Sequence, residues 1–202
     1  INSETIDMLQ HFTCQFYGTY GMTETISHVA LMPLNGNLRS PYYTVLPGIT
    51  ITQDERGCLV INGDHLKGNK IITNDLVESI NTTTFKWLGR WDNVINSGGL
   101  KVIPEKLEVE IGKITHELGI NQNFVVSSMT DPKLGNKIIL LMEHEISHPL
   151  LEKLKVEMKK RIPKHEVPKV VLSGSPFVFT DTGKINRAAT VKHALDSRKP
   201  TI

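Results

Sequence analysis

The residue pattern of the chain changes once, near residue 92, and this change constrains the fold more than any other feature. Between residues 29 and 87, short β-like segments alternate with turns rich in Pro, Gly, Asn and Asp, a pattern typical of antiparallel β structure. After residue 91, some segments carry apolar residues at helical spacing and others are short apolar runs. The sequence therefore predicts an α+β chain of two domains, residues 1–91 and 92–202.

The first part is predicted to be a small β-rich subdomain preceded by one helix. Its expected elements are a helix at 3–11, a strand at 12–17, a Gly-containing loop at 18–24, and β segments at 58–61, 70–73 and 83–87. The second part is predicted to be a compact α+β module. Its expected elements are helices at 104–118, 149–161 and 186–195, strands at 123–129, 137–143 and 167–172, and a hairpin turn at 131–135.

The composition is that of a globular protein. The 202 residues are 39% hydrophobic and 22% charged, which excludes a disordered or fibrous chain. Cys14 and Cys58 are too few for a disulfide scaffold, and the absence of an 18-residue apolar run predicts no membrane span. We therefore expect a cytoplasmic protein. The chain starts at Ile1 without a leader sequence, so we expect either that its true N-terminus was removed or that it is a piece of a longer protein.

A net charge of +2 conceals a strongly basic C-terminal quarter. Residues 149–202 carry a net charge of +7, whereas residues 1–148 carry −5. Such a surplus suits a phosphate-rich partner, which could be a nucleotide, a cofactor or a nucleic acid, and it equally suits a solubilising charged face. Because 6% of residues are aromatic and no recognition motif is present, nucleic-acid binding is not expected.

Four short motifs contain the residue types that a nucleotide site needs. The first, at 20–25, combines an aromatic ring that could stack on a base, a glycine that permits close backbone approach, a hydroxyl, and a carboxylate that could hold Mg²⁺. The second, at 73–75, ends a strand-like run with Asp75, whose carboxylate could accept hydrogen bonds from two ribose hydroxyls. Taken alone, the first motif is better interpreted as an ordinary turn, and the second as an Asx turn.

The third motif, at 89–101, contains Arg90, which could pair with a ribose or phosphate, and the glycine pair Gly98 and Gly99. It could also be a β-hairpin with a glycine turn, and its position at the pattern change suits a hinge. The fourth motif, at 180–187, places Lys184 after a glycine, where its ammonium could meet a carboxylate or phosphate in a transition state. The alternative is a solvated surface lysine.

Residues 144–148 match the zinc metallopeptidase pattern H-E-x-x-H. That chemistry needs both histidines on one face of a helix. Here the motif follows an apolar strand, and His148 precedes Pro149, which disfavours the α conformation. We therefore interpret the match as chance, and we expect it to run from a strand end to a helix start.

In their order and spacing, the first four motifs together resemble those of the adenylate-forming enzymes, which include acyl-CoA synthetases, nonribosomal peptide adenylation domains and luciferases. The resemblance covers essentially the whole chain. Within the family, residues 74–78 and 88–99 are most similar to the o-succinylbenzoate–CoA ligases of menaquinone biosynthesis. The resemblance implies that residues 1–91 are the C-terminal part of the large AMP-binding domain and that residues 92–202 are a mobile lid domain.

The resemblance also implies a two-step reaction. A small-molecule carboxylic acid would attack the α-phosphate of ATP·Mg²⁺, and coenzyme A would then displace AMP from the acyl-adenylate. By matching positions, the nucleotide would be bound by Tyr20, Gly21, Met22, Thr23, Asp75, Arg90 and Lys184.

Individual roles follow from the same matching. Tyr20 would stack on adenine, Thr23 would contact the α-phosphate, and Glu24 would serve Mg²⁺. Asp75 and Arg90 would hold the ribose, and Lys184 would act with Thr23 and Glu24 in the first step. Asp92 would be the hinge, and Gly98 and Gly99 would line the pantetheine path of coenzyme A.

The chain departs from the family pattern at three points. Asn74 stands where many relatives have Gly, and Asn96 stands where some carry Lys, so we assign no catalytic role to Asn96. No phosphate loop precedes Tyr20. We therefore expect a fragment with little or no ligase activity by itself. The alternatives are a stand-alone binding module derived from a ligase lid and, less favoured, the zinc metallopeptidase; a homo-oligomer is left open.

Overall fold

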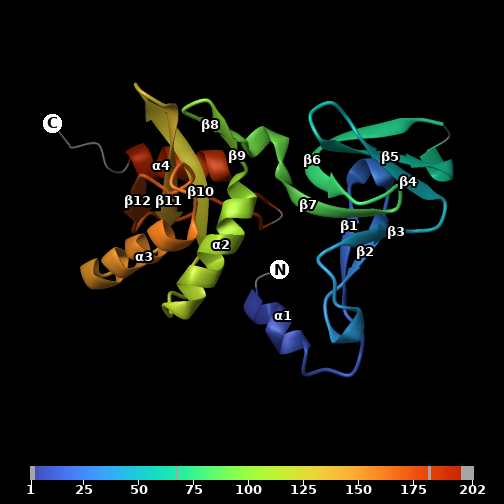
Figure 1. Ribbon diagram of the computed structural model, residues 1–202, viewed down its shortest axis with the longest axis horizontal. Helices are drawn as coiled ribbons and strands as arrows, with labels where there is room; N and C mark the ends of the chain where they lie inside the picture. Colours follow the sequence, from blue (N-terminus) through green and yellow to red (C-terminus); the bar gives the residue numbers. More distant parts are fainter. Residues whose placement is uncertain (1–2, 67, 182, 197–202) are drawn as a thin grey trace. The chain divides into compact units, whose positions relative to one another are not determined.

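The computed structural model describes residues 3–66, 68–181 and 183–196 (Figure 1). The chain divides into two compact units, unit 1 (Ile1–Asp92) and unit 2 (Asn93–Ile202). This division lies one residue from the boundary expected after residue 91. Each unit has a hydrophobic core of its own.

Unit 1 is an antiparallel sheet of seven strands that follows the short helix α1 (Ser3–Leu9). The strand order is β1-β2-β3-β7-β6-β5-β4. The strands are β1 (Tyr17–Gly21), β2 (His28–Pro33), β3 (Tyr43–Val45), β4 (Ile49–Gln53), β5 (Cys58–Gly63), β6 (Lys70–Ser79) and β7 (Thr84–Arg90). Alternate apolar residues of these strands form the core, including the fully buried Leu59, Ile61 and Phe85. The predicted β-rich character of this part is confirmed.

The predicted strand at 12–17 is wrong, and so is the loop predicted at 18–24, because the strand lies at Tyr17–Gly21. Asn35, which is buried, supplies hydrogen bonds that a neighbouring strand would otherwise provide to the preceding segment. Its Oδ1 accepts from the backbone N–H of Phe16 at 2.8 Å, and its Nδ2 donates to the carbonyl of Cys14 at 2.8 Å. The apolar run therefore becomes an irregular loop, and the Asn35 side chain satisfies part of its backbone.

Unit 2 contains three helices and five strands among its described residues. In chain order they are β8 (Ile95–Ser97), β9 (Leu100–Val102), α2 (Pro104–Glu117), β10 (Phe124–Asp131), β11 (Gly135–Met142), α3 (His148–Arg161), β12 (Val170–Ser173) and α4 (Arg187–Asp196). The sheet order is β10-β11-β8-β9, and β12 pairs in parallel with β11. Every helix and strand predicted for this part is present, with ends shifted by a few residues.

The sheet of unit 2 is covered on both faces. Val126, Ile138 and Leu140 point into a cluster with residues of α2 and α3. Their neighbours Val125, Ile139 and Leu141 point to the other face, into a cluster that includes Ala194 of α4. Because adjacent strand residues face opposite sides, this alternation gives three layers and explains why β11 is a continuous apolar run. The predicted α+β class is confirmed.

Candidate functional site

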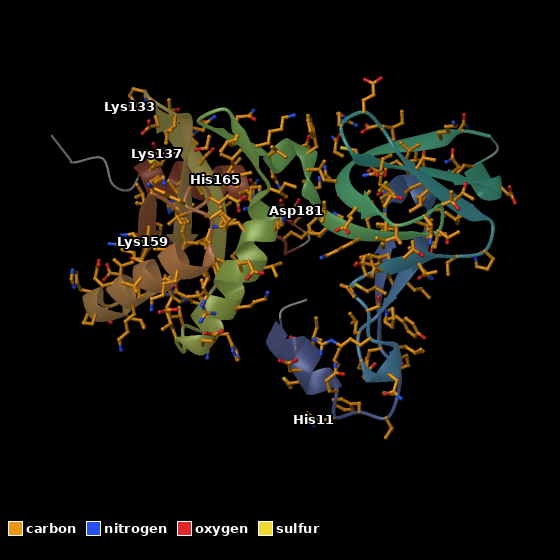
Figure 2. All side chains as sticks on the ribbon, in the orientation of Figure 1. His11, Lys133, Lys137, Lys159, His165 and Asp181 are labelled. Atoms are coloured by element: carbon orange, nitrogen blue, oxygen red, sulfur yellow. The ribbon has the colours of Figure 1, made fainter. Side chains whose placement is uncertain are left out.

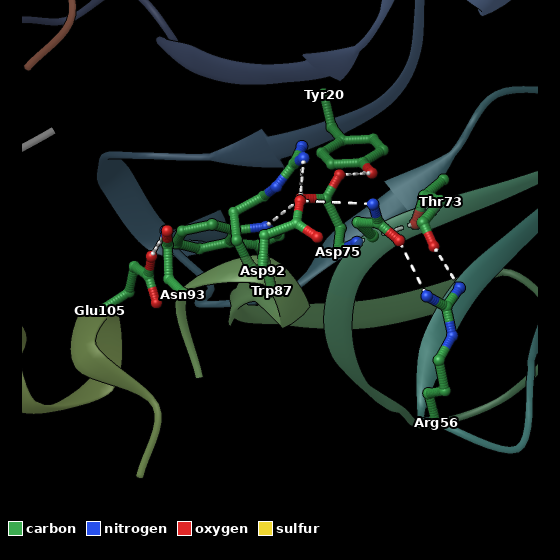
Figure 3. A network of polar contacts seen from close by, with 10 residues as sticks. Tyr20, Arg56, Thr73, Asp75, Trp87, Asp92, Asn93 and Glu105 are labelled. Carbon is green, nitrogen blue, oxygen red and sulfur yellow. Dashed lines mark hydrogen bonds and ion pairs between the residues drawn. The ribbon is translucent and has the colours of Figure 1, made fainter. Parts of the chain in front are cut away.

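A polar cluster in unit 1 is built on a distortion of β6 (Figure 3). Cys58 of β5 pairs with Leu76, whereas Val60 pairs with Ile72, so residues 73–75 of β6 lie opposite the single residue between them on β5. Such a bulge frees backbone groups from the ladder and re-aims side chains. The sequence placed residues 73–75 at the end of a strand; they lie inside β6, where Asp75 pairs with Arg90 of β7.

Asp75 is the centre of this cluster. It is 7% exposed. Its Oδ2 accepts from the hydroxyl of Tyr20 at 2.6 Å, and its Oδ1 accepts from Trp87 Nε1 at 3.1 Å. Arg90 Nη1 lies 3.8 Å from the same Oδ1. The two hydrogen bonds hold Asp75 in a fixed orientation. Because an ionised carboxylate offers about four acceptor positions, Asp75 still has capacity for further donors.

Tyr20 lies against an aromatic wall. Its ring makes edge contacts with Tyr43 and Phe85, at centroid distances of 5.7 and 5.2 Å. Burial, together with the hydrogen bond to Asp75 and the charge of that residue, raises the pKa of Tyr20 well above its usual value. The hydroxyl is therefore neutral and remains a donor to Asp75.

Arg90 links Asp75 to the end of unit 1. Its Nη2 donates to Asp92 Oδ2 at 2.9 Å, and Asn74 Nδ2 donates to the same oxygen at 3.3 Å. Four of the residues selected from the sequence, Tyr20, Asp75, Arg90 and Asp92, are thus brought together by hydrogen bonds and ion pairs.

Sequence reasoning missed two residues of this cluster, Arg56 and Trp87. Arg56 donates from Nη1 to Asn74 Oδ1 at 2.8 Å and from Nη2 to the carbonyl of Thr73 at 3.0 Å. Its Nε also donates to Asp54 Oδ2 at 2.8 Å. Arg56 therefore fixes the bulge, and Trp87 fixes the carboxylate. The strand pattern at 83–87 is the one sequence signal that includes Trp87. It does not show which residues the Trp87 and Arg56 side chains contact, because those contacts depend on where the bulges lie.

The loop after β1 presents Thr23 and Glu24 to solvent. They lie in a short 3₁₀ turn (Thr23–Thr25), anchored by buried Thr25, whose hydroxyl accepts from the backbone N–H of Met22 at 3.0 Å and donates to the carbonyl of Ser27 at 2.7 Å. No side-chain hydrogen bond or ion pair of Thr23 or Glu24 is found among the described residues. Ile26 follows in a strained turn with φ +64°.

Glu24 fits one type of metal site. No cluster of three or more His, Cys, Asp or Glu side chains that could hold a metal occurs in the described part of the chain. A single exposed carboxylate nevertheless suits Mg²⁺, because this ion keeps several waters and often binds one or two carboxylates together with substrate phosphates.

The remaining predicted site residues lie in unit 2. Gly98 and Gly99 form the two-residue turn between β8 and β9, with φ values of +58° and +82°. Two positive φ values are the requirement of the type I′ hairpin turn, which glycine satisfies. The hairpin considered from the sequence is therefore the structure that forms. Asn96, to which no role was assigned, pairs with Lys101 across it.

Lys184 lies in a tight turn before α4. The backbone N–H of Thr180 donates to the carbonyl of Lys184 at 2.7 Å, and the N–H of Lys184 donates to Thr180 Oγ1 at 3.1 Å. The Lys184 side chain is exposed, and its ammonium has no partner among the described residues. Thr182 of the same motif lies outside the described residues.

The H-E-x-x-H match runs from a strand end to a helix start, as expected. β11 ends at Met142 and α3 begins at His148, so the two histidines do not share a helix face. This geometry does not fit the metallopeptidase arrangement.

The lysines of α3 are partly neutralised within their own helix. Lys155 pairs with Glu152 at 2.8 Å, and Lys160 pairs with Glu157 at 2.7 Å. Lys159 extends from the same helix (Figure 2). Exposed i,i+3 pairs of this kind are typical of a solvated helix face. Among the described residues, no helix is long and apolar enough to cross a bilayer.

Comparison with known proteins shows which class of protein this chain is similar to. No family model matches the sequence. The structure is similar to that of an AMP-forming acyl-CoA synthetase/AMP-acid ligase II-like protein from Dyadobacter fermentans, with a TM-score of 0.52 and 40% identity, over 96% of this chain and 55% of that one. In sequence and fold, the chain is thus similar to AMP-forming acyl-CoA synthetases, which are adenylate-forming enzymes.

Two further relatives carry more specific names. A probable 2-succinylbenzoate–CoA ligase of Mycobacterium tuberculosis is 25% identical over 183 residues, which cover 86% of this chain and 46% of that protein. The o-succinylbenzoate coenzyme A synthetase of Bacillus subtilis, in complex with ATP and magnesium, shares the fold with a TM-score of 0.68 at 16% identity, over 95% of this chain and 44% of that one. The chain thus spans about half the length of the curated relatives that it matches.

Proposed function

We propose that this chain carries the ribose site and the catalytic lysine of an ATP-dependent, AMP-forming acid–CoA ligase. The observation that carries the proposal is the preorganised carboxylate of Asp75, buried and held by Tyr20 and Trp87. A fixed carboxylate with spare acceptor positions suits the two hydroxyls of a ribose. Arg90, which lies beside it, supplies a positive charge.

Each remaining site residue has a role consistent with its environment. Glu24, exposed and unpaired among the described residues, would hold Mg²⁺ bound to the ATP phosphates, and Thr23 would contact the α-phosphate. Tyr20 would offer its ring to adenine, with Gly21 and Met22 beside it.

Lys184 would stabilise the charge that develops as the acid attacks the α-phosphate. Asp92 would be the hinge, and Gly98 and Gly99 would line the path of coenzyme A.

The acid that we propose is 2-succinylbenzoate, so that the reaction would serve menaquinone biosynthesis. The support is the name of the Mycobacterium tuberculosis relative and the similar fold of the Bacillus subtilis enzyme. Since the chain spans about half of such relatives, we propose that the phosphate loop and most of the acid pocket belong to the N-terminal half of the complete ligase, and that this chain alone is inactive.

Acid-dependent exchange of pyrophosphate into ATP tests the proposal in the complete ligase that carries this chain. We expect exchange with 2-succinylbenzoate, a much lower rate with benzoate, and a loss of at least a hundredfold in Lys184→Ala. Thioester formation from preformed acyl-adenylate should survive that substitution. Unaltered exchange in Lys184→Ala would overturn the role of the lysine, and the absence of exchange with every acid would favour a binding module.

A further inference from the structure

The turn that carries Lys184 is shaped by bonds within its own segment. Asn186 donates its backbone N–H to the carbonyl of Val178 at 2.8 Å, and its Oδ1 accepts from the N–H of Ala189 at 3.1 Å, capping α4. Buried Thr190 bonds to Val178 as well, at 3.1 Å. These contacts fix the shape of the turn, but they do not join it to α2.

Arg187, three residues after Lys184, makes the connection to α2 and β10. Its Nη1 donates to Glu108 Oε1 at 2.5 Å and to the carbonyl of Val126, while its Nη2 donates to Glu108 Oε2 at 3.2 Å. The same Nη2 lies 3.4 Å from Glu105 Oε1. We call these four residues (Arg187, Glu105, Glu108 and Val126) the Arg187 clamp. Its members come from three elements, so the clamp sets where the turn lies with respect to α2.

Glu105 ties the clamp to the start of unit 2. Asn93, the first residue of this unit, donates from Nδ2 to Glu105 Oε1 at 2.5 Å (Figure 3). The other oxygen, Oε2, is buried and lacks a partner among the described residues. A single atom, Glu105 Oε1, therefore contacts both Asn93 at the start of the unit and Arg187.

We propose that Arg187 is a positioning residue for adenylate formation, and that the clamp places the Lys184 ammonium for this step. The inference rests on the proposed function of Lys184. Hydrophobic packing of α4, through Ala194 against Leu141 and Leu172, attaches the helix independently of the clamp. Loss of the clamp therefore shifts the turn without unfolding the unit. A displacement of about 1 Å can reduce the rate of a positioned reaction roughly a hundredfold.

The test measures both half-reactions of the complete ligase in four variants. Arg187→Ala removes the clamp, and Arg187→Lys keeps the charge but not the forked geometry. Lys184→Ala tests the proposed function. Arg161→Ala is the matched control, because Arg161 makes a comparable forked ion pair with Glu117 elsewhere in unit 2. For each variant, pyrophosphate exchange and thioester formation from supplied acyl-adenylate are measured with the melting temperature.

We expect Arg187→Ala to lower kcat for exchange about thirty- to hundredfold while thioester formation changes less than threefold. Arg187→Lys should recover part of the loss, and Arg161→Ala should leave both half-reactions unchanged. Equal loss of both half-reactions in Arg187→Ala would reduce the clamp to a structural role and overturn the proposal. The proposal would also be overturned if Arg187→Ala kept full pyrophosphate exchange while Lys184→Ala lost it. Full exchange in Lys184→Ala would instead refute the proposed function.

A double variant adds a readout that a general loss of stability would not give. Glu108→Gln keeps the size of the side chain and one acceptor oxygen, but it removes the charge and one of the two oxygens that accept from Arg187. If the two residues act through one contact, Arg187→Ala with Glu108→Gln should lose no more exchange activity than Arg187→Ala alone. Multiplicative losses would contradict the clamp.

Discussion

At the scale of single residues, the cluster around Asp75 shows how an acidic side chain is prepared for a ligand. The carboxylate is desolvated by burial, yet Tyr20 and Trp87 donate to it and Arg90 lies within 3.8 Å. Charge-assisted hydrogen bonds of this kind are stronger than neutral ones. The side chain therefore does not need to reorient when further donors arrive.

Gly21, in the first sequence motif, is required by the packing of the backbone itself. A Cβ at this position would lie 2.6 Å from the carbonyl oxygen of Ser27 and 2.7 Å from Cα of His28. We expect Gly21→Ala to lower the free energy of unfolding of unit 1 by about 3 kcal/mol, because backbone atoms would have to move. Tryptophan fluorescence in urea measures this unit, since Trp87 and Trp91 both belong to it.

Gly18→Ala is the matched control in the same strand. Its Cβ would meet the flexible end of Met32 at 3.3 Å, so the loss should be below about 1 kcal/mol. If the two variants unfolded at the same urea concentration, close backbone approach would not be the reason for Gly21.

At the scale of elements, irregular segments depend on single polar side chains. The loop at 10–16 has no partner strand, and the Asn35 amide bonds to backbone groups of Leu9, Cys14 and Phe16 instead. We expect Asn35→Ala to destabilise unit 1 by about 2 kcal/mol, because several partly buried backbone groups would lose their partner. Exposed Asn37→Ala, measured by the same urea unfolding, should change stability by less than about 0.5 kcal/mol; an equal loss would refute the role of Asn35.

The β10–β11 hairpin makes unit 2 sensitive to acid. The backbone N–H groups of Lys133 and Leu134, and then the charge of Lys137, hold the pKa of Asp131 below its ordinary value of 3.8. A carboxylate with a lowered folded-state pKa stabilises above its ordinary pKa, and this contribution is lost as the pH falls through the folded value. Stability of unit 2 should therefore decrease from about pH 5 downward.

Asp131→Asn keeps the acceptor oxygen but not the charge. The difference in unfolding free energy between wild type and this variant should be largest near neutral pH and should shrink toward pH 2, as followed by amide exchange in β10 and β11. Asp181→Asn, which changes an exposed carboxylate without a hydrogen bond among the described residues, should give a curve parallel to wild type. A constant difference for Asp131→Asn would contradict the assignment.

At the scale of the whole molecule, the sequence predicts the division into two units and most elements of unit 2. Helix α2 is marked by Pro104 and Gly119 at its ends, and β11 by a continuous apolar run, signals that depend on local sequence alone. The strand predicted at 12–17 lies instead at Tyr17–Gly21. The reason is that Asn35, which is distant in sequence, bonds to backbone groups of the preceding segment. The bulge in β6 and the contacts of Arg56 and Trp87 likewise depend on strand register, which no local pattern encodes.

We propose that Asp75 binds the ribose of a nucleotide, and removal of the ribose hydroxyls tests this role. Calorimetric titration would compare AMP with 2′,3′-dideoxy-AMP for wild type and Asp75→Asn of the complete protein that carries this chain. Wild type should bind AMP about ten- to hundredfold more tightly than the dideoxy analogue, as expected for charge-assisted hydrogen bonds, and Asp75→Asn should lose most of this preference. Equal affinity of wild type for the two nucleotides would contradict the ribose-binding role of Asp75.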